Sequence, residues 1–228
     1  MKTPTTFQQA PIPMYDESGL LPGEHIAYDE EGRKYLCWHD LIDIRVPLFD
    51  DPSILLTKRI PQPLHHRNPR SILTEIDADW WDRTRRRVYS SSGDHCRCCG
   101  VHKTDQLGWS KNIDAHELYA INYQTGEMRL KAIVPLCASG CHAGVHFGRL
   151  TARYEAGKIQ PKTYYQTISY CNTVLDKANL PAKNWDATVN DNIYNIPWSS
   201  WHLTLVIDGK EQKFYSLYKD QADLESHY

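Results

Sequence analysis

The centre of the chain changes from an alternating to a helical pattern of hydrophobic positions. Residues 113–123 alternate and are rich in apolar and aromatic side chains, which predicts a strand with one buried face. Gln-Thr-Gly-Glu at 124–127 is a turn signal, and residues 128–136 fit the returning strand. Residues 141–157 then have helical spacing. The pattern therefore predicts strand, turn, strand and helix in that order.

Helical spacing also predicts one helix on each side of this centre. In residues 79–89, Trp80, Thr84 and Val88 fall on one face, and Asp77 or Asp79 is a suitable cap. Residues 161–179 repeat the pattern with apolar or aromatic side chains at Tyr164, Ile168, Cys171 and Leu175. Both helices are therefore expected to be amphipathic and to pack on the central elements.

The two ends of the chain differ in character. Residues 201–207 and 210–217 alternate around Asp208-Gly209, which is a strong signal for a β-hairpin. Residues 1–70 are rich in proline and turn residues, so long helices are not expected there and only a short strand pair fits residues 26–38. We therefore divide the chain into an arm (1–70), a central unit (71–157) and an extension of helix and hairpin (158–228).

Composition restricts the class of protein. The chain has 228 residues, of which 41% are hydrophobic and 24% charged, as in ordinary globular proteins. A formal net charge of -2 means that any contact with nucleic acid must come from a local basic patch. No long apolar run and no apolar signal core is present, so we expect no membrane contact and a cytoplasmic location.

Five of the seven cysteines gather between residues 96 and 141. Two pairs, one with C-x2-C and one with C-x3-C spacing, favour a tetrahedral zinc site over disulfides. Cys98, inside the first pair, is expected to be a small buried side chain, and Cys37 and Cys171 to be packed thiols. The four expected zinc ligands are Cys96, Cys99, Cys137 and Cys141.

Three histidines accompany the cysteine pairs. His116 lies in the first expected strand, and His142 and His146 are spaced to share one face of the expected helix. This arrangement predicts a second metal site, lined by histidine. The alternatives are a hydrogen-bonded structural role for His116, an exposed helix surface for His142 and His146, or His146 in the zinc shell.

Five segments together carry a family resemblance. They are Trp81-Asp-Arg-Thr-Arg-Arg-Arg-Val-Tyr89, Cys96-Arg-Cys-Cys-Gly100, Ala115-His-Glu-Leu-Tyr119, Leu136-Cys-Ala-Ser-Gly-Cys-His142 and Val145-His-Phe-Gly-Arg149. In combination they resemble the HNH endonucleases, also called ββα-metal or His-Me finger nucleases. The similarity is to a bacterial and phage subset of that family. It covers residues 81–89 and 96–150.

The resemblance implies a fold and an activity. The fold would be α+β, with a zinc-stabilised ββα-metal finger between N- and C-terminal extensions, the latter ending in a β-hairpin. The activity would be hydrolysis of phosphodiester bonds in nucleic acid. His116 matches the general base, His142 and His146 match the ligands of Mg²⁺, Mn²⁺ or another divalent cation, and the four cysteines match a structural zinc site.

The chain departs from the family pattern at the catalytic metal. Ala115 stands where many HNH proteins have a ligand, and Ala132 stands near the position of the middle asparagine. Asp114 or Glu117 is therefore expected to complete the metal shell. The alternative function is a catalytically inactive, zinc-stapled protein of HNH descent that binds nucleic acid or a protein partner.

Arginines supply the expected contact with nucleic acid, which we expect to be DNA. The residues are Arg83, Arg85, Arg86, Arg87 and Arg149. Four of them follow one another so closely that they spread around the helix, so part of this run could simply be a solvated face.

Overall fold

The central hairpin forms as the alternation predicts. β4 (Ile113–Asn122) pairs antiparallel with β5 (Glu127–Cys137), and the register shifts between Leu118 and Tyr119. The Asn122 side chain accepts hydrogen bonds from the backbone N–H groups of Gln124 and Thr125, which closes the turn. The computed structural model describes residues 17–105, 112–186 and 196–227, and the statements below refer to these residues.

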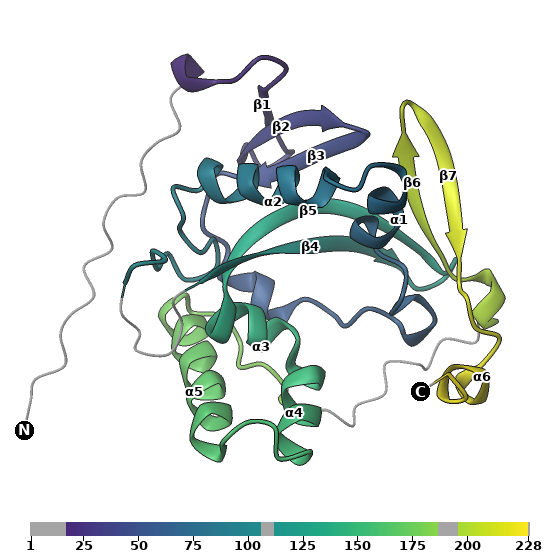
Figure 1. Ribbon diagram of the computed structural model, residues 1–228. Coiled ribbons are helices and arrows are strands. Elements are labelled where there is room, and N and C mark those ends of the chain that lie inside the picture. The colour runs from purple at the N-terminus through teal and green to yellow at the C-terminus, as the bar shows by residue number, and fades with distance from the viewer. Residues whose placement is uncertain (1–16, 106–111, 187–195, 228) are drawn as a thin grey trace, which may run out of the picture.

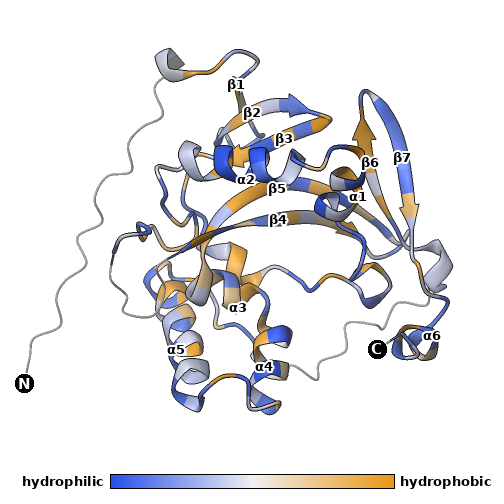
Figure 2. Cartoon of the chain, in the orientation of Figure 1, coloured by the Kyte–Doolittle hydropathy of each residue, from blue (hydrophilic) through white to orange (hydrophobic). Residues whose placement is uncertain are grey.

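The C-terminal hairpin extends the same sheet. β6 (His202–Ile207) pairs antiparallel with β7 (Lys210–Tyr215), and its first residues pair parallel with the start of β5, giving the order β4-β5-β6-β7. Asp208 and Gly209 both have positive φ, 47° and 77°, as the predicted Asp-Gly turn requires. Figure 2 shows the contrast between hydrophobic β6 and hydrophilic β7, since β6 is almost wholly buried and β7 is an exposed edge.

The N-terminal segment contains a second sheet of three strands. β1 (His25–Tyr28) and β2 (Lys34–Asp40) confirm the expected strand pair, and β3 (Ile42–Pro47) is an additional strand. A single residue, Leu41, joins β2 to β3 with φ of 63°, a conformation that is uncommon for a leucine. Because no glycine or asparagine marks this turn, the third strand is not predicted from local pattern.

Helices cover both faces of the central hairpin (Figure 1). On one face lie α1 (Pro69–Ile76) and α2 (Trp80–Ser91), and on the other lie α3 (Ala143–Val145), α4 (Phe147–Glu155) and α5 (Pro161–Lys177). The described structure is thus α+β, with two sheets and six α-helices, the last being α6 (Gln221–Glu225). Short 3-10 turns occur at Glu17–Gly19, Pro52–Leu56, Gln62–Leu64 and Trp198–Ser200.

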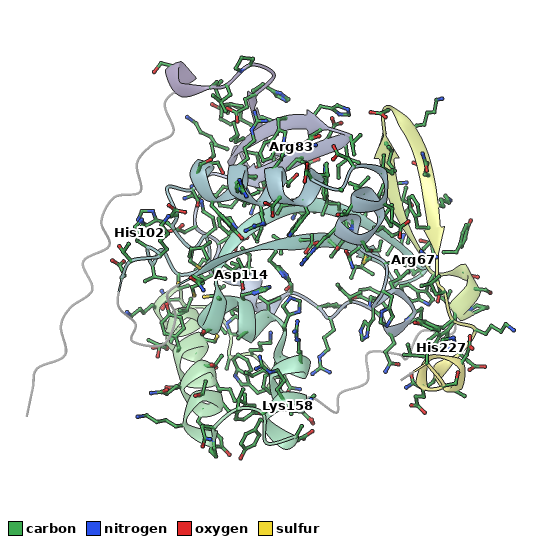
Figure 3. The ribbon with its side chains drawn as sticks, viewed as in Figure 1. Arg67, Arg83, His102, Asp114, Lys158 and His227 are labelled. Carbon is green, nitrogen blue, oxygen red and sulfur yellow. The ribbon has the colours of Figure 1, made fainter. Side chains whose placement is uncertain are left out.

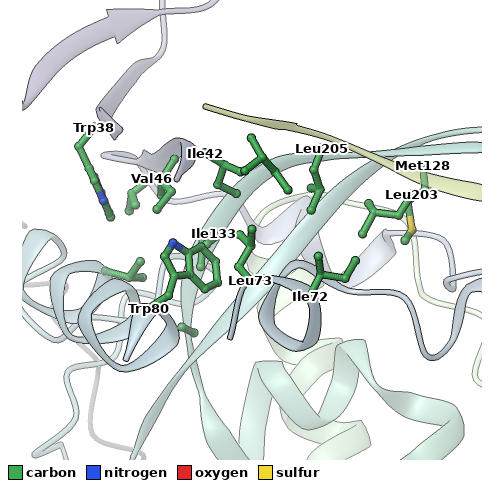
Figure 4. Packing of buried hydrophobic residues seen from close by; sticks show 14 of the residues in the cluster. Trp38, Ile42, Val46, Ile72, Leu73, Trp80, Met128, Ile133, Leu203 and Leu205 are labelled. Carbon is green, nitrogen blue, oxygen red and sulfur yellow. The ribbon is translucent and has the colours of Figure 1, made fainter. Parts of the chain in front are cut away.

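Two clusters of buried side chains hold these layers together. The larger cluster joins both sheets to α2 and includes Trp38, Trp80 and Ile133 (Figure 4). The Trp80 indole N–H donates to the Asp40 carbonyl at 2.7 Å. The predicted inner face of α2 is confirmed, since Trp80, Thr84 and Val88 are buried. The second cluster lies between β5 and α5 and contains six of the cysteines.

The helix expected over residues 141–157 is not continuous. Ala138–His142 form a π-helical turn, α3 follows, and the backbone breaks at His146 (φ −85°, ψ 40°) before α4. The Cys137 sulfur accepts a hydrogen bond from the Cys141 N–H at 3.2 Å, so the first turn is wound around that sulfur. Among the described helices, none is long and apolar enough to cross a membrane.

Candidate metal centres

The four predicted zinc ligands come together at one end of the hairpin. The sulfurs of Cys96, Cys99, Cys137 and Cys141 all lie within 4.8 Å of one another, and Cys99 Sγ is 3.8 Å from Cys137 Sγ. Four sulfurs at about 2.3 Å from a tetrahedral zinc ion would be separated by about 3.8 Å. The cluster could therefore hold a metal such as zinc.

Two segments that are distant in the sequence position these sulfurs. Cys137 ends β5, Cys141 follows in the π-helical turn, and the first pair lies in the loop after α2. That loop is fixed from both sides, because the Arg97 N–H donates to the Pro135 carbonyl and the Arg97 carbonyl accepts from the Asp51 N–H. The cluster thus ties the N-terminal segment and α2 to the central hairpin.

Neighbouring groups donate hydrogen bonds to the sulfurs. The Tyr170 hydroxyl of α5 donates to Cys99 Sγ at 3.0 Å, in addition to the Cys141 N–H on Cys137 Sγ. Such donors stabilise thiolate charge around a metal. Cys98 and Cys171 are fully buried beside this cluster, which confirms that they are packed thiols.

Three histidines form a second cluster on the side of the sheet that carries α3 and α4. His116 comes from β4, His142 ends the π-helical turn, and His146 stands at the break before α4. Their ring centroids are 4.8 to 5.3 Å apart, and one nitrogen from each lies within 4.8 Å of the others. The helical break does not separate the predicted pair, and the three side chains could hold a metal ion.

Burial keeps two of these rings neutral. It lowers the pKa of His116 well below the usual value, and repulsion from His146 and His142 adds to this effect. Burial also lowers the pKa of His146 to about 4. His116 is only 6% exposed, and its Nδ1 has no hydrogen-bond partner among the described residues. Neutral imidazoles are the form that binds metal ions or accepts protons.

Asp114 lies against one histidine and does not belong to the group of donor atoms. Its Oδ2 is 2.9 Å from His142 Nδ1, and this hydrogen bond lowers the pKa of the Asp114 carboxyl. A carboxylate accepts only, so His142 donates from Nδ1 and leaves Nε2 for a metal. Asp114 was expected as a direct ligand, whereas the structure gives it the position of a residue that orients His142.

Glu117 also lies outside the group of three histidines. Its carboxyl is largely enclosed, and burial raises its pKa, opposed by the nearby positive charge of Arg70. Side chains of successive strand residues point to opposite faces, which explains why Glu117 does not join the cluster that His116 enters.

Four of the five predicted arginines lie on α2, which covers the other face of the hairpin (Figures 1 and 3). Each of the four is paired with a carboxylate: Arg83 with Asp40 and Asp77, Arg85 and Arg86 with Asp82, and Arg87 with Glu24. Arg149 differs, because it lines the same cleft as His116 and His146.

This cleft has a volume of about 720 Å³ and runs between β4, α4 and the N-terminal segment. Lys58 and Arg59 of that segment form part of its wall, together with His65. Sequence reasoning missed Lys58 and Arg59. The only local signal was a basic pair between prolines, and nothing in the spacing placed that pair beside the histidines.

Comparisons of the chain with protein-family models, with curated proteins and with solved structures returned no match.

Proposed function

We propose that the chain is a metal-dependent endonuclease that hydrolyses phosphodiester bonds in nucleic acid. The observation that carries the proposal is the meeting of three histidines on a strand-turn-strand-helix framework, beside a cluster of four cysteines. Two of these histidines, His116 and His146, line a cleft. This order of elements and ligands agrees with the resemblance to the HNH family that the sequence motifs carry.

Each histidine has a proposed role. His142 and His146 would hold the cation, and Asp114 would keep His142 in the tautomer that leaves Nε2 available. A divalent cation bound there would supply positive charge that stabilises the phosphate in the transition state. His116, as a neutral imidazole, would accept the proton of the attacking water.

One observation favours the alternative function. His116 is only 6% exposed, and no carboxylate belongs to the group of donor atoms formed by the described residues. A protein of this kind that binds nucleic acid or a protein partner without cutting would need the cysteine centre but no working histidine centre.

A cleavage screen separates the two functions. Purified protein that retains its zinc would be incubated with plasmid, single-stranded DNA and RNA in Mg²⁺, Mn²⁺, Ni²⁺ or Zn²⁺. Wild type should cut, and His116→Ala should lose about 10²–10⁴ in rate, as removal of a positioned base does. If wild type cuts no nucleic acid with any of these cations, the nuclease proposal fails.

The same variants separate a base from a ligand at position 116. His142→Ala should weaken binding of the cation and be partly rescued by more metal. His116→Ala should leave the affinity for the cation nearly unchanged while the rate falls. A large loss of metal affinity in His116→Ala would instead make His116 the third ligand.

A further inference from the structure

The cations that line the histidine cleft differ from the arginines of α2. Neither Lys58 nor Arg149 forms an ion pair with a carboxylate in the described part of the chain, whereas each arginine of α2 does. Lys58 Nζ lies 4.8 Å over the Tyr123 ring, and Arg59 donates to the Asp186 carbonyl at 3.0 Å. Positive charge available to a phosphate therefore lies at the cleft and not on the arginine-rich helix.

The opposite wall of the cleft is apolar. Leu118, Tyr119 and Ile121 of β4 line it, and Ile60 and Val145 add apolar surface from the other side. Among the described residues that line the main cleft, Glu117 is the one carboxylate. A ligand that fits must therefore offer both negative charge and flat apolar faces.

A smaller recess continues this surface. It has a volume of about 200 Å³ and shares Lys58, Arg59 and Val145 with the main cleft. Phe147, Lys183 and Asp186 also line it, and Lys183 is held there by hydrogen bonds to the carbonyls of Leu55 and Gly144. Basic and apolar side chains thus follow one another along a path past the histidines.

Single-stranded and double-stranded nucleic acids differ in how well they fit this surface. A duplex presents phosphates and groove edges, while its base faces are stacked inside; an unpaired strand presents phosphates and base faces together. The histidines are also recessed, since His116 is only 6% exposed. We propose that the cleft binds single-stranded nucleic acid, with Lys58 and Arg149 contacting its phosphates and the β4 wall contacting its bases. This inference rests on the proposed function and names its substrate class.

The test measures binding separately from cleavage. Fluorescence anisotropy would follow the zinc-containing protein, without added divalent cation, on a labelled DNA strand, the RNA strand of the same sequence, and the DNA strand annealed to its complement. One or both single strands should bind at least about tenfold more tightly than the duplex. Equal or tighter binding of the duplex, or no binding of either single strand, overturns the inference.

Charge variants locate the contact. Lys58→Ala with Arg149→Ala should weaken binding of the single strand and reduce the salt slope by about 0.7 for each cation lost. Arg85→Ala with Arg86→Ala removes the same charge from the opposite face and should leave the slope unchanged. If only the second pair has an effect, the cleft is not the binding surface.

The cleavage screen distinguishes failure of the inference from failure of the proposed function. Cleavage with preferred binding of duplex would overturn the substrate class and keep the nuclease. Tight binding of single strands without cleavage in any divalent cation would keep the cleft assignment and overturn the nuclease.

Discussion

At the scale of single residues, one carboxylate outside the group of three histidines orients one of their rings. The Asp114 carboxylate accepts a hydrogen bond from His142 Nδ1 and so selects the tautomer that presents Nε2. Loss of such a partner typically weakens metal binding 10- to 100-fold. Asp114→Ala should therefore lower the affinity of the histidine centre for Co²⁺ or Zn²⁺ by about that factor, as measured by calorimetric titration.

The cysteine centre is the internal control for Asp114→Ala, because its zinc content should not change. His142→Ala is the second control and should have the larger effect, since it removes a donor atom. If Asp114→Ala and His142→Ala lose the same metal affinity, Asp114 is a direct ligand. If Asp114→Ala loses no metal affinity, Asp114 does not orient His142.

Tyr170 has the corresponding position at the cysteine centre. Its hydroxyl donates to Cys99 Sγ at 3.0 Å, while its ring packs against Gly140. Tyr170→Phe keeps the ring and removes the hydrogen bond, so zinc affinity in chelator competition should fall by about 10-fold or more. Tyr165→Phe on the exposed side of α5 is the matched control. The same affinity for both variants would contradict this role.

At the scale of elements, local pattern predicted the parts that depend on nearby residues. The β4–β5 hairpin, α2 and the Asp208-Gly209 turn all formed where alternation, helical spacing and turn residues placed them. Local pattern did not predict the backbone where contacts between distant residues determine it. The continuous helix predicted over 141–157 is wrong, because a π-helical turn extends to His142 and the backbone leaves helical geometry at His146.

Replacing either of two glycines beside this break with alanine should change stability in opposite directions. A Cβ at Gly144 in α3 would lie 2.4 Å from Cys171 Sγ and 3.2 Å from Leu55 Cδ2, whereas a Cβ at Gly148 in α4 would meet no atom within 4 Å. Gly144→Ala should destabilise the fold by about 1–3 kcal/mol through overpacking. Gly148→Ala should stabilise it by up to about 1 kcal/mol, because alanine favours helix.

Urea unfolding of the two glycine variants checks this difference. The two changes add the same methyl group to neighbouring helices, so the sign of the effect should depend only on packing. If Gly144→Ala is as stable as wild type, α3 does not pack closely against Cys171.

Arginines on α2 act as structural residues in the described fold. Arg87 Nε donates to the Glu24 carboxylate at 2.6 Å, and the side chain of Glu24 is only 1% exposed. Arg87→Ala would leave that carboxylate buried without its partner, so the free energy of unfolding should fall by about 2 kcal/mol. Removing one partner of a fully buried ion pair costs about 3–5 kcal/mol. The loss expected here is smaller, because Arg87 keeps some contact with solvent.

Arg86→Ala provides the comparison within the same helix. Its side chain is 73% exposed in a pair with Asp82, so the change should alter stability by less than about 0.5 kcal/mol. Chemical denaturation of both variants measures the difference. Equal stabilities would mean that the contact between Arg87 and Glu24 contributes nothing.

At the scale of the whole molecule, the sequence predicted the members of both centres better than their surroundings. Cysteine spacing identified four thiols that do meet, and the three histidines meet although the helical segment that carries two of them is broken. The wall formed by Lys58 and Arg59 was not predictable, since it depends on how the N-terminal segment crosses the hairpin. For the same reason, the carboxylate partners of the arginine run could not be predicted from the sequence.

The central proposal is that one chain holds two metal centres of different chemistry. An all-imidazole group suits Zn²⁺ or Ni²⁺ better than Mg²⁺ or Mn²⁺, which prefer oxygen ligands. The cysteine centre should keep its metal through purification, while the histidine centre should exchange.

Metal counting by mass spectrometry of the native protein after equilibration with Zn²⁺ tests this proposal most directly. We expect two ions per chain for wild type, one for His142→Ala with His146→Ala, and loss of the tightly held ion in Cys99→Ser. A single ion in wild type that is unaffected by the histidine changes would contradict the proposal and leave a protein with one structural zinc and no catalytic centre.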